Sequence, residues 1–177
     1  MEPMDEGQVI EMCKRGDLSA YRALYDRYEQ PLLRTACRML GRQEDAEDAV
    51  QDAFLRLYRG IDGFRSGARF STYLFRILMN ACFDVLRKRK GAEFKNLDIE
   101  RLPFHSSHED KHTLAEAVGA LPPQMKSCFT LFAVEEFKHE EIAGILNISE
   151  GSVKANIHRA RKKLREWLSP LPDGGTR

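Results

Sequence analysis

The chain has 177 residues, of which 42% are apolar and 31% are charged, with 28 Lys and Arg against 27 Asp and Glu. This length fits one ordinary domain or two small ones, and the apolar content excludes wholesale disorder. A formal net charge of +1 argues at first against a nucleic-acid partner, since proteins that bind nucleic acids commonly carry a basic excess.

The balanced total conceals blocks of alternating sign. Residues 1–60, 61–90, 91–150 and 151–177 carry 9, 7, 5 and 7 basic residues against 12, 2, 11 and 2 acidic ones. The net charges of these blocks are therefore −3, +5, −6 and +5. Two short basic blocks alternate with two acidic ones, so the average charge hides two surfaces that could attract an anionic partner.

The sequence carries no visible targeting or membrane segment. Its start lacks the basic and apolar regions of a secretory signal, and no apolar run approaches the ~20 residues that span a bilayer. We therefore expect a cytoplasmic protein without membrane insertion. The four cysteines are far apart and form no CxxC pair, so we expect buried thiols rather than disulfides or a zinc finger: Cys13, Cys37, Cys82 and Cys128.

Helical periodicity dominates the first 90 residues, and strand-like alternation is nearly absent. Apolar and aromatic residues at intervals of three and four predict a helix over 18–41, which Pro31 should kink or interrupt. A second amphipathic helix is predicted over 45–58, followed by a glycine-containing loop. A third helix should begin near residue 71 and end in the basic run 87–90.

The periodic pattern fails between about residues 91 and 112 and then resumes. A stretch of this length without a period is typical of a linker between domains. Further helices are predicted over 114–121, from Pro123, over 138–146 and over 149–168. The sequence thus predicts an all-α fold with two small helical domains, at 1–90 and 113–170. A flexible linker at 91–112 joins them, and a disordered tail follows at 171–177.

Residues 139–157 have the organisation of a helix-turn-helix. Ala143 is small where two helices must approach closely, and Asn147 tolerates the left-handed backbone that the turn requires. Ile148 can fill the core from the turn, and Ser149 can cap the second helix through its hydroxyl.

The second helix of this motif is predicted to bury one apolar face, made of Val153, Ile157, Ala160 and Leu164. Basic residues follow the opposite face: Lys154, His158, Arg161 and Arg165, flanked by Ala155, Arg159 and Lys162. Such a helix places its N-terminal residues against base edges in a major groove, while longer basic side chains contact phosphates. An amphipathic helix with a merely solvated basic face is the alternative, and the turn signature disfavours it.

The basic block at 61–90 interleaves arginines with aromatic residues around a glycine loop at 63–67. Arginines supply phosphate contacts, and an exposed ring or polar pocket can hold an unstacked base, so the composition suits DNA that is being opened. In the alternative interpretation Phe70, Tyr73, Leu74 and Phe75 are mostly core, and the sequence does not tell which ring is exposed.

With these motifs in this order, the whole chain from about Ala20 to Leu168 resembles an extracytoplasmic-function (ECF) sigma factor of the sigma-70 superfamily. Four stretches carry the resemblance: 21–41, 45–54, 70–80, and Leu121-Pro122 followed by the helix-turn-helix. The resemblance implies a sigma region 2 bundle, a sigma region 4 helix-turn-helix, and transcription initiation by promoter recognition and DNA melting.

The resemblance also implies partners and site residues. Core RNA polymerase would be bound through the clamp helices of its largest subunit and through its flap, with these clamp contacts: Asp45, Asp48, Gln51, Asp52 and Arg56. Recognition of the minus-ten promoter element and capture of a flipped base would fall to Arg65, Arg69, Ser71, Tyr73, Arg76, Asn80, Arg87 and Lys88. Recognition of the minus-thirty-five element would fall to Ser152, Lys154, Ala155, Asn156, His158, Arg159, Arg161 and Lys162.

The chain departs from its relatives at Ala155-Asn156, where they often have Ser-Arg. Asn156 could pair with adenine if it faces the groove, but a contact from arginine to the DNA backbone would be lost, so promoter preference does not carry over. Members of the family are usually held inactive by an anti-sigma factor, and this chain has no appended C-terminal domain to regulate in its place. A separate anti-sigma partner is therefore expected.

The residues give weaker support to three other functions. An enzyme is not expected, because no phosphate-binding glycine loop occurs and the segment 139–143 matches only the start of HExxH. Neither a cofactor nor a small-molecule substrate is expected. A metal site at His105, His108 and His112, with Cys128, is possible by ligand type, but a polar linker explains these histidines better. A stand-alone helix-turn-helix regulator is the main alternative, and it would leave residues 20–90 without a role.

Overall fold

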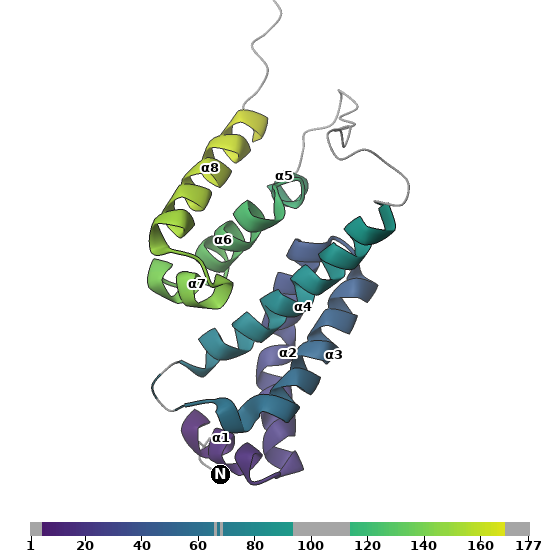
Figure 1. Ribbon diagram of the computed structural model, residues 1–177, viewed down its shortest axis with the longest axis vertical. Helices are drawn as coiled ribbons and strands as arrows, with labels where there is room; N and C mark the ends of the chain where they lie inside the picture. The colour runs from purple at the N-terminus through teal and green to yellow at the C-terminus, as the bar shows by residue number, and fades with distance from the viewer. Residues whose placement is uncertain (1–4, 66, 68, 94–113, 169–177) are drawn as a thin grey trace, which may run out of the picture.

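The computed structural model describes residues 5–65, 67, 69–93 and 114–168. Within these residues every regular element is a helix, which confirms the all-α class (Figure 1). In chain order the elements are α1 (Glu6–Lys14), α2 (Leu18–Leu40), α3 (Gln43–Gly60), the 3-10 turn η1 (Ile61–Gly63), α4 (Phe70–Glu93), α5 (Leu114–Gly119), α6 (Pro123–Ala133), α7 (His139–Leu146) and α8 (Glu150–Leu168).

The long helices α2, α3 and α4 form the N-terminal unit, side by side in Figure 1. Asp17 caps α2 by accepting hydrogen bonds from the Ser19 and Ala20 backbone amides, and Gly41 ends it in the left-handed conformation, φ 73°. Apolar side chains from all three helices, such as Leu24, are completely or almost completely buried between them. That burial is the main source of stability for helices of this kind.

One expectation for this unit was wrong in part, and one helix was not predicted. Pro31 does not interrupt α2, which is one helix from Leu18 to Leu40. The neighbouring Leu32 is fully buried, and the packing of this face against α3 and α4 offsets the single backbone hydrogen bond that proline cannot donate. The helix α1 was not predicted at all. It buries Val9, Ile10 and Cys13 against α2 and η1.

Two predicted helices are longer in the structure than the sequence pattern indicated. The helix α3 begins at Gln43, two residues before the predicted start, and continues to Gly60. The helix α4 runs from Phe70 to Glu93, so it crosses the domain boundary predicted at residue 90. The glycine loop between them contains the η1 turn and then the extended residue Phe64.

The C-terminal unit, α5 to α8, follows the predicted helix-turn-helix closely. Asn147 has φ 53° and ψ 48°, the left-handed conformation expected at the turn. The Ser149 hydroxyl accepts a hydrogen bond from the Ser152 backbone amide at 3.1 Å and so caps α8. Pro123 opens α6, and Val153 and Ile157 are buried as predicted.

The two units pack against each other. The helix α7 lies on α4, while α5 and α6 contact α2 (Figure 1). One apolar cluster runs from the bundle through Phe137 and Ile142 to the interior of the helix-turn-helix. A second, smaller cluster is confined to the C-terminal unit and joins α5, α6 and α8. None of the helices in the described ranges combines the length and the apolar character that a membrane crossing requires.

Candidate promoter and polymerase interfaces

The second helix of the helix-turn-helix, α8, presents a basic face to solvent. Its apolar stripe, Val153, Ile157, Ala160 and Leu164, is at most 5% exposed, as the periodicity predicted. On the other side, six of the predicted minus-thirty-five residues are exposed: Lys154, Ala155, His158, Arg159, Arg161 and Lys162. This face is therefore open to a DNA groove.

Asn156 is an exception: pairing with adenine was expected only if its side chain faces the groove, and in this structure the side chain faces the core. Its side chain is only 5% exposed, and its amide nitrogen donates a hydrogen bond to the Ser152 carbonyl at 2.9 Å. The side-chain amide therefore already makes a hydrogen bond within the helix. It faces the core with Val153 and Ala160, and in this position it cannot pair with adenine. Ser152 is half-buried, and its hydroxyl shares a hydrogen bond with Ser149 at 2.8 Å.

The helix α4 presents four of the eight predicted minus-ten residues along one stripe. Tyr73, Arg76, Asn80 and Arg87 are spaced by three, four and seven residues, so they share one helical face. Arg76 and Asn80 are exposed. Tyr73 is half-buried, because its hydroxyl donates to the Gly60 carbonyl at 2.9 Å and the Arg76 guanidinium covers its ring at 5.5 Å. A base could stack here only over the uncovered part of the ring.

The aromatic residues before and within α4 are mainly structural. Phe70, Leu74 and Phe75 are buried, which confirms the core interpretation for these three. Phe64, at the end of the glycine loop, packs edge-on against Phe70 with ring centroids 5.4 Å apart and planes at 90°. This contact fixes the loop against the bundle, while Arg65 beside it is exposed.

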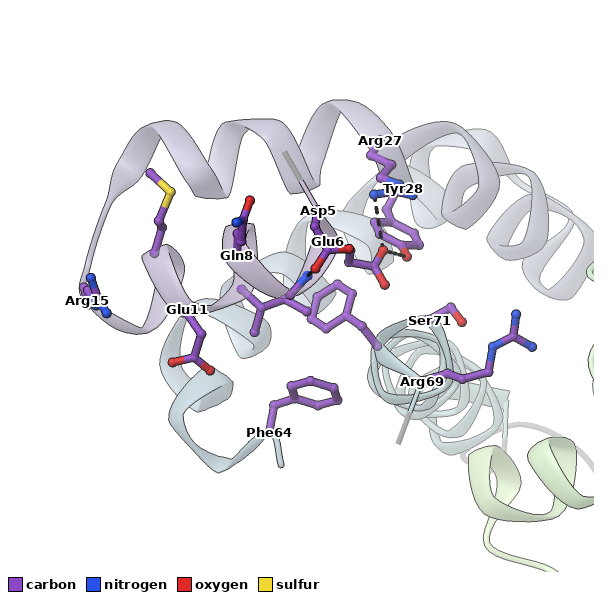
Figure 2. Close-up of a pocket in the computed structure, with 14 residues that line it drawn as sticks. Asp5, Glu6, Gln8, Glu11, Arg15, Arg27, Tyr28, Phe64, Arg69 and Ser71 are labelled. Atoms are coloured by element: carbon purple, nitrogen blue, oxygen red, sulfur yellow. Dashed lines mark hydrogen bonds and ion pairs between the residues drawn. The ribbon is translucent and has the colours of Figure 1, made fainter. Parts of the chain in front are cut away.

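A cavity of about 840 Å³ lies beside this loop, between α1, α2 and the start of α4 (Figure 2). Its wall includes Phe64, Arg69 and Ser71, of which the last two were predicted to contact the minus-ten element. A cavity of this size is in the range that accommodates a small organic ligand.

Sequence reasoning missed the part of the cavity wall that α1 and α2 supply. Tyr28 donates a hydrogen bond to the Glu6 carboxylate at 2.6 Å, and Arg27 lies 3.5 Å from the same carboxylate. Burial, together with the Glu6 hydrogen bond, raises the pKa of the Tyr28 hydroxyl, which therefore stays protonated. Arg15 completes this side of the wall. No pattern within 1–30 pointed to these residues, because they meet only when α1 folds back on α2.

Two of the remaining minus-ten candidates are already paired within the protein. Arg87 makes an ion pair with Asp84 on its own helix. Arg69 donates to the Glu141 carboxylate of α7 at 2.9 Å, and Figure 2 shows its side chain extending away from the cavity. Lys88 is exposed.

On the predicted polymerase-binding helix, α3, some of the five predicted contact residues are exposed and others form ion pairs within the protein. Asp48 and Gln51 are exposed. Arg56 bridges Asp52 on α3 and Asp84 on α4, with both nitrogen–oxygen distances at 2.7 Å. Asp45 pairs with Arg89 of α4 and lies 3.7 Å from Arg42. Three of the five predicted contacts thus also tie α3 to its surroundings, which leaves Asp48 and Gln51 as the most accessible.

An apolar groove of about 530 Å³ adjoins Gln51 on the surface between α2 and α3. Leu18, Leu55 and Tyr58 line it and are 71%, 54% and 53% exposed. Large apolar side chains gathered in this way are typical of the centre of a protein–protein interface.

Metal binding finds no support in the described residues. No group of three or more His, Cys, Asp or Glu side chains in residues 5–65, 67, 69–93 and 114–168 could hold a metal ion. His105, His108 and His112 lie outside the described residues. All four cysteines are free; Cys13, Cys82 and Cys128 are buried as expected, and Cys37 is half-buried.

Both halves of the chain match sigma-factor family models. Residues 24–92 match Sigma-70 region 2, and residues 111–164 match Sigma-70 region 4. The chain is 34% identical to the ECF RNA polymerase sigma factor SigW of Bacillus subtilis, over 92% of this chain and 96% of that protein. It is 30% identical to the ECF RNA polymerase sigma factor SigE of Mycolicibacterium smegmatis, over 96% of this chain and 71% of that protein.

Solved structures give the same result for the fold. CnrH in complex with the cytosolic domain of CnrY matches with a TM-score of 0.69 and 26% identity, over 90% of this chain and 94% of that one. The sigma factor RpoE in complex with the anti-sigma factor NepR, from Bartonella quintana, matches with a TM-score of 0.70 and 25% identity, over 84% of this chain and 96% of that one. The chain therefore belongs to the ECF family of RNA polymerase sigma factors, the alternative sigma factors of the sigma-70 superfamily.

Proposed function

We propose that this sigma factor binds core RNA polymerase through α3 and reads the two promoter elements with two separate basic surfaces. The observation that carries the proposal is the placement of these surfaces. One lies on α4 of the region 2 unit and the other on α8 of the region 4 unit, and each is open to solvent over most of its predicted DNA contacts. We assign residues 5–93 and 114–168 to these two units.

The helix α8 recognises the minus-thirty-five element. Its start enters the major groove, where Ala155 meets base edges and Lys154 contacts a phosphate, and His158, Arg159 and Lys162 contact phosphates further along. Arg161 lies over the ring of Phe132 at 5.0 Å, which holds its guanidinium near the same face. Asn156 is buried, so we assign it no contact with adenine.

The loop and helix around residues 64–80 read the minus-ten element and hold it open. Arg65, Arg76 and Asn80 contact the backbone and the bases of the separated strand. The cavity beside Phe64 and Ser71 accepts an extruded base. Unpairing and unstacking that base costs a few kcal/mol. Phosphate contacts, stacking and polymerase binding offset this cost.

The exposed part of α3 docks on the clamp helices of the largest polymerase subunit. Asp48 and Gln51 provide polar contacts, and the neighbouring groove of Leu18, Leu55 and Tyr58 provides an apolar centre. The chemical step of RNA synthesis is supplied by the polymerase, so we propose no catalysis by the sigma factor itself.

An anti-sigma factor is a further expected partner, acting in the cytoplasm. The support comes from the two solved relatives, CnrH and RpoE, whose structures were determined with CnrY and with the anti-sigma factor NepR. We expect such a partner to bind across both units, because a bound inhibitor must keep both DNA-reading surfaces from the promoter.

Reconstitution separates this function from that of a stand-alone helix-turn-helix regulator. The purified chain is mixed with core RNA polymerase and passed over a sizing column, with and without excess free sigma factor of another class. A sigma factor co-elutes with core and is displaced by the competitor. A stand-alone regulator elutes alone and binds its operator duplex without polymerase, and this result would overturn the proposal.

A further inference from the structure

One predicted minus-ten residue, Tyr73, lies outside the wall of the cavity that we assign to an extruded base. Among the described residues that wall includes Phe64 and Ser71 but not Tyr73. The Tyr73 ring is also partly covered, because the Arg76 guanidinium lies 5.5 Å from its centroid. Direct stacking of the extruded base on Tyr73 is therefore not the role that the structure favours.

The Tyr73 hydroxyl instead binds the end of α3. It donates a hydrogen bond to the Gly60 carbonyl at 2.9 Å, 13 positions earlier in the chain. Gly60 is the last residue of α3, and the η1 turn and Phe64 follow it directly. The hydroxyl thus ties the start of α4 to the point at which the glycine loop leaves α3.

The Tyr73 ring packs against Phe64, the aromatic residue of the loop that lines the cavity. The two ring centroids are 5.2 Å apart. Phe70 completes a group of three rings, at 5.4 Å from Phe64 and 6.4 Å from Tyr73, and rings at such distances attract each other beyond simple area burial. The Phe64 backbone amide also donates to the Ile61 carbonyl at 2.9 Å. Residues 60–64 are therefore held at both ends, and Tyr73 contributes to each.

We propose that Tyr73 is a positioning residue for base capture, which holds Phe64 and the turn before it against the cavity and does not itself receive the base. This inference rests on the proposed function. An extruded base gives up its pairing and stacking in the duplex. A pocket whose wall is already fixed loses less conformational freedom when the base enters, so the base is bound more tightly. In this role the hydroxyl of Tyr73 is needed as well as its ring, whereas a stacking platform needs the ring alone.

Tyr73→Phe separates the two roles, because it keeps the ring and removes the hydrogen bond to Gly60. The protein is the holoenzyme, the complex of this chain with core polymerase. The probe is a fluorescent single strand with the minus-ten region of a promoter mapped by transcription in vitro, together with versions that each lack one base. Fluorescence anisotropy measures the affinities, and the captured base is the one whose removal weakens wild-type binding most.

Tyr73→Phe should weaken binding of the intact strand about two- to tenfold, the usual effect of one lost hydrogen bond. It should leave binding of the strand that lacks the captured base unchanged. Wild-type affinity for the intact strand would overturn the inference, since a ring that stacks directly needs no hydroxyl. Equal weakening of both strands would also overturn it, because the hydroxyl would then act on the fold in general.

A second variant tests whether Tyr73 acts through Phe64. Phe64→Leu removes the ring that meets Tyr73, so adding Tyr73→Phe to it should cause less than about half of the loss seen in the wild-type background. Phe83→Leu is the matched control, since Phe83 is a half-buried ring further along α4. In that background Tyr73→Phe should keep its full effect. Full additivity with Phe64→Leu would show that Tyr73 does not act through this ring.

Hydrogen exchange tests the contact without DNA. In the free chain, the amides of residues 61–65 should exchange about two- to tenfold faster in Tyr73→Phe than in wild type, since the loop opens locally more often. Unchanged exchange would overturn the inference and leave the proposed function standing. If the loop amides do exchange faster but removal of any base leaves wild-type binding unchanged, base capture itself fails, and with it the proposed role of the cavity.

Discussion

Lys154 and Asn156 stand two residues apart on α8 and differ in exposure. Lys154 is exposed on the basic face, where it also lies 3.2 Å from Glu150. Asn156 is buried and bonded to Ser152. One residue is therefore assigned to DNA and the other to the fold, and substitutions should separate the two.

Lys154→Ala should weaken binding of the holoenzyme to the minus-thirty-five element and reduce the salt dependence of binding by about one phosphate contact. Asn156→Ala should leave that salt dependence unchanged but lower the free energy of unfolding by about 1 kcal/mol, because a buried hydrogen bond is lost. Filter binding across a salt series and urea denaturation measure the two effects. A changed salt slope in Asn156→Ala would show that the asparagine does reach the DNA.

Asp48 offers the clearest test of the polymerase interface, since it is exposed near the middle of α3. Asp48→Lys should weaken core binding on the order of 100-fold, because it reverses a charge within a complementary interface. The fold should be retained, as surface substitutions usually change stability by less than about 0.5 kcal/mol. Fluorescence anisotropy with labelled core measures the affinity. Glu44→Lys, exposed at the start of the same helix, should bind core almost as well as wild type.

At this scale the sequence predicted the buried and exposed faces of α8 except at position 156, and this exception has a simple cause. Position 156 is three residues after Val153 and four before Ala160, so helical spacing alone places it on the buried face. The resemblance to relatives with arginine there favoured a DNA contact instead. The partners of Asp45 and Arg56 were beyond prediction, because Arg89 and Asp84 are 44 and 28 residues away along the chain.

The helices α3 and α4 are tied together by an ion pair as well as by their apolar faces. Arg56 donates to Asp84 at 2.7 Å, and both side chains are partly buried. The hydrogen bond from Arg56, aided by Arg87, holds the pKa of Asp84 below its usual value of 3.8. Asp84 therefore favours folding in its charged form.

Asp84→Asn should lower the free energy of unfolding at neutral pH, and this difference from wild type should shrink as the pH falls. Since the pKa is lower in the folded state, the wild-type carboxylate contributes fully above its unfolded-state pKa near 3.8. The contribution is lost as the pH falls through the folded value. Urea denaturation at pH 7, 5 and 3 should show the wild-type advantage at the first two and a smaller one at the third. An advantage that grows toward pH 3 would contradict the assignment.

Element by element, the strongly periodic helices could be predicted and the short ones could not. The helix α1 has nine residues, too few to be stable without tertiary contacts, and its few apolar positions, such as Val9 and Ile10, gave no sustained period. Continuity through Pro31 likewise depends on packing against α3 and α4, which local sequence does not encode. The cavity beside Phe64 could not be predicted for the same two reasons, since α1 and α2 form much of its wall.

As a whole molecule, the protein is a pair of units with a common apolar cluster. The cluster links Leu78 of α4 with Ile142 and Ile145 of α7. A division into two domains could be predicted from the aperiodic stretch at 91–112, but their packing could not. The contact from Thr35 to Glu135 joins residues 100 positions apart, and no local pattern encodes it.

The common cluster predicts that both units of the free protein unfold together. Trp167 is the single tryptophan and packs in the C-terminal cluster, so its fluorescence reports that unit alone. Far-UV circular dichroism reports all helices. Urea transitions followed by the two signals should coincide, as for one cooperative unit. A tryptophan transition at clearly lower urea would show that the C-terminal unit unfolds independently of the bundle.

The alternating charge blocks acquire a meaning at this scale. The two basic blocks, 61–90 and 151–177, contain most of α4 and of α8, the two proposed DNA readers. The acidic blocks contain α3 and the turn between α6 and α7, which packs against the N-terminal unit. Near neutrality of the whole chain is therefore compatible with DNA binding, because the acidic residues are assigned to protein contacts.

Transcription of fragmented genomic DNA in vitro tests the central claim most directly. Core polymerase, the purified chain, or both are incubated with DNA from the source organism, and the 5′ ends of the transcripts are sequenced. We predict a set of start sites that requires both proteins and that shares two sequence elements upstream, about 10 and 35 base pairs away and thus roughly 85 Å apart at ~3.4 Å per base pair. The same start sites with core alone, or none with both proteins, would contradict the account.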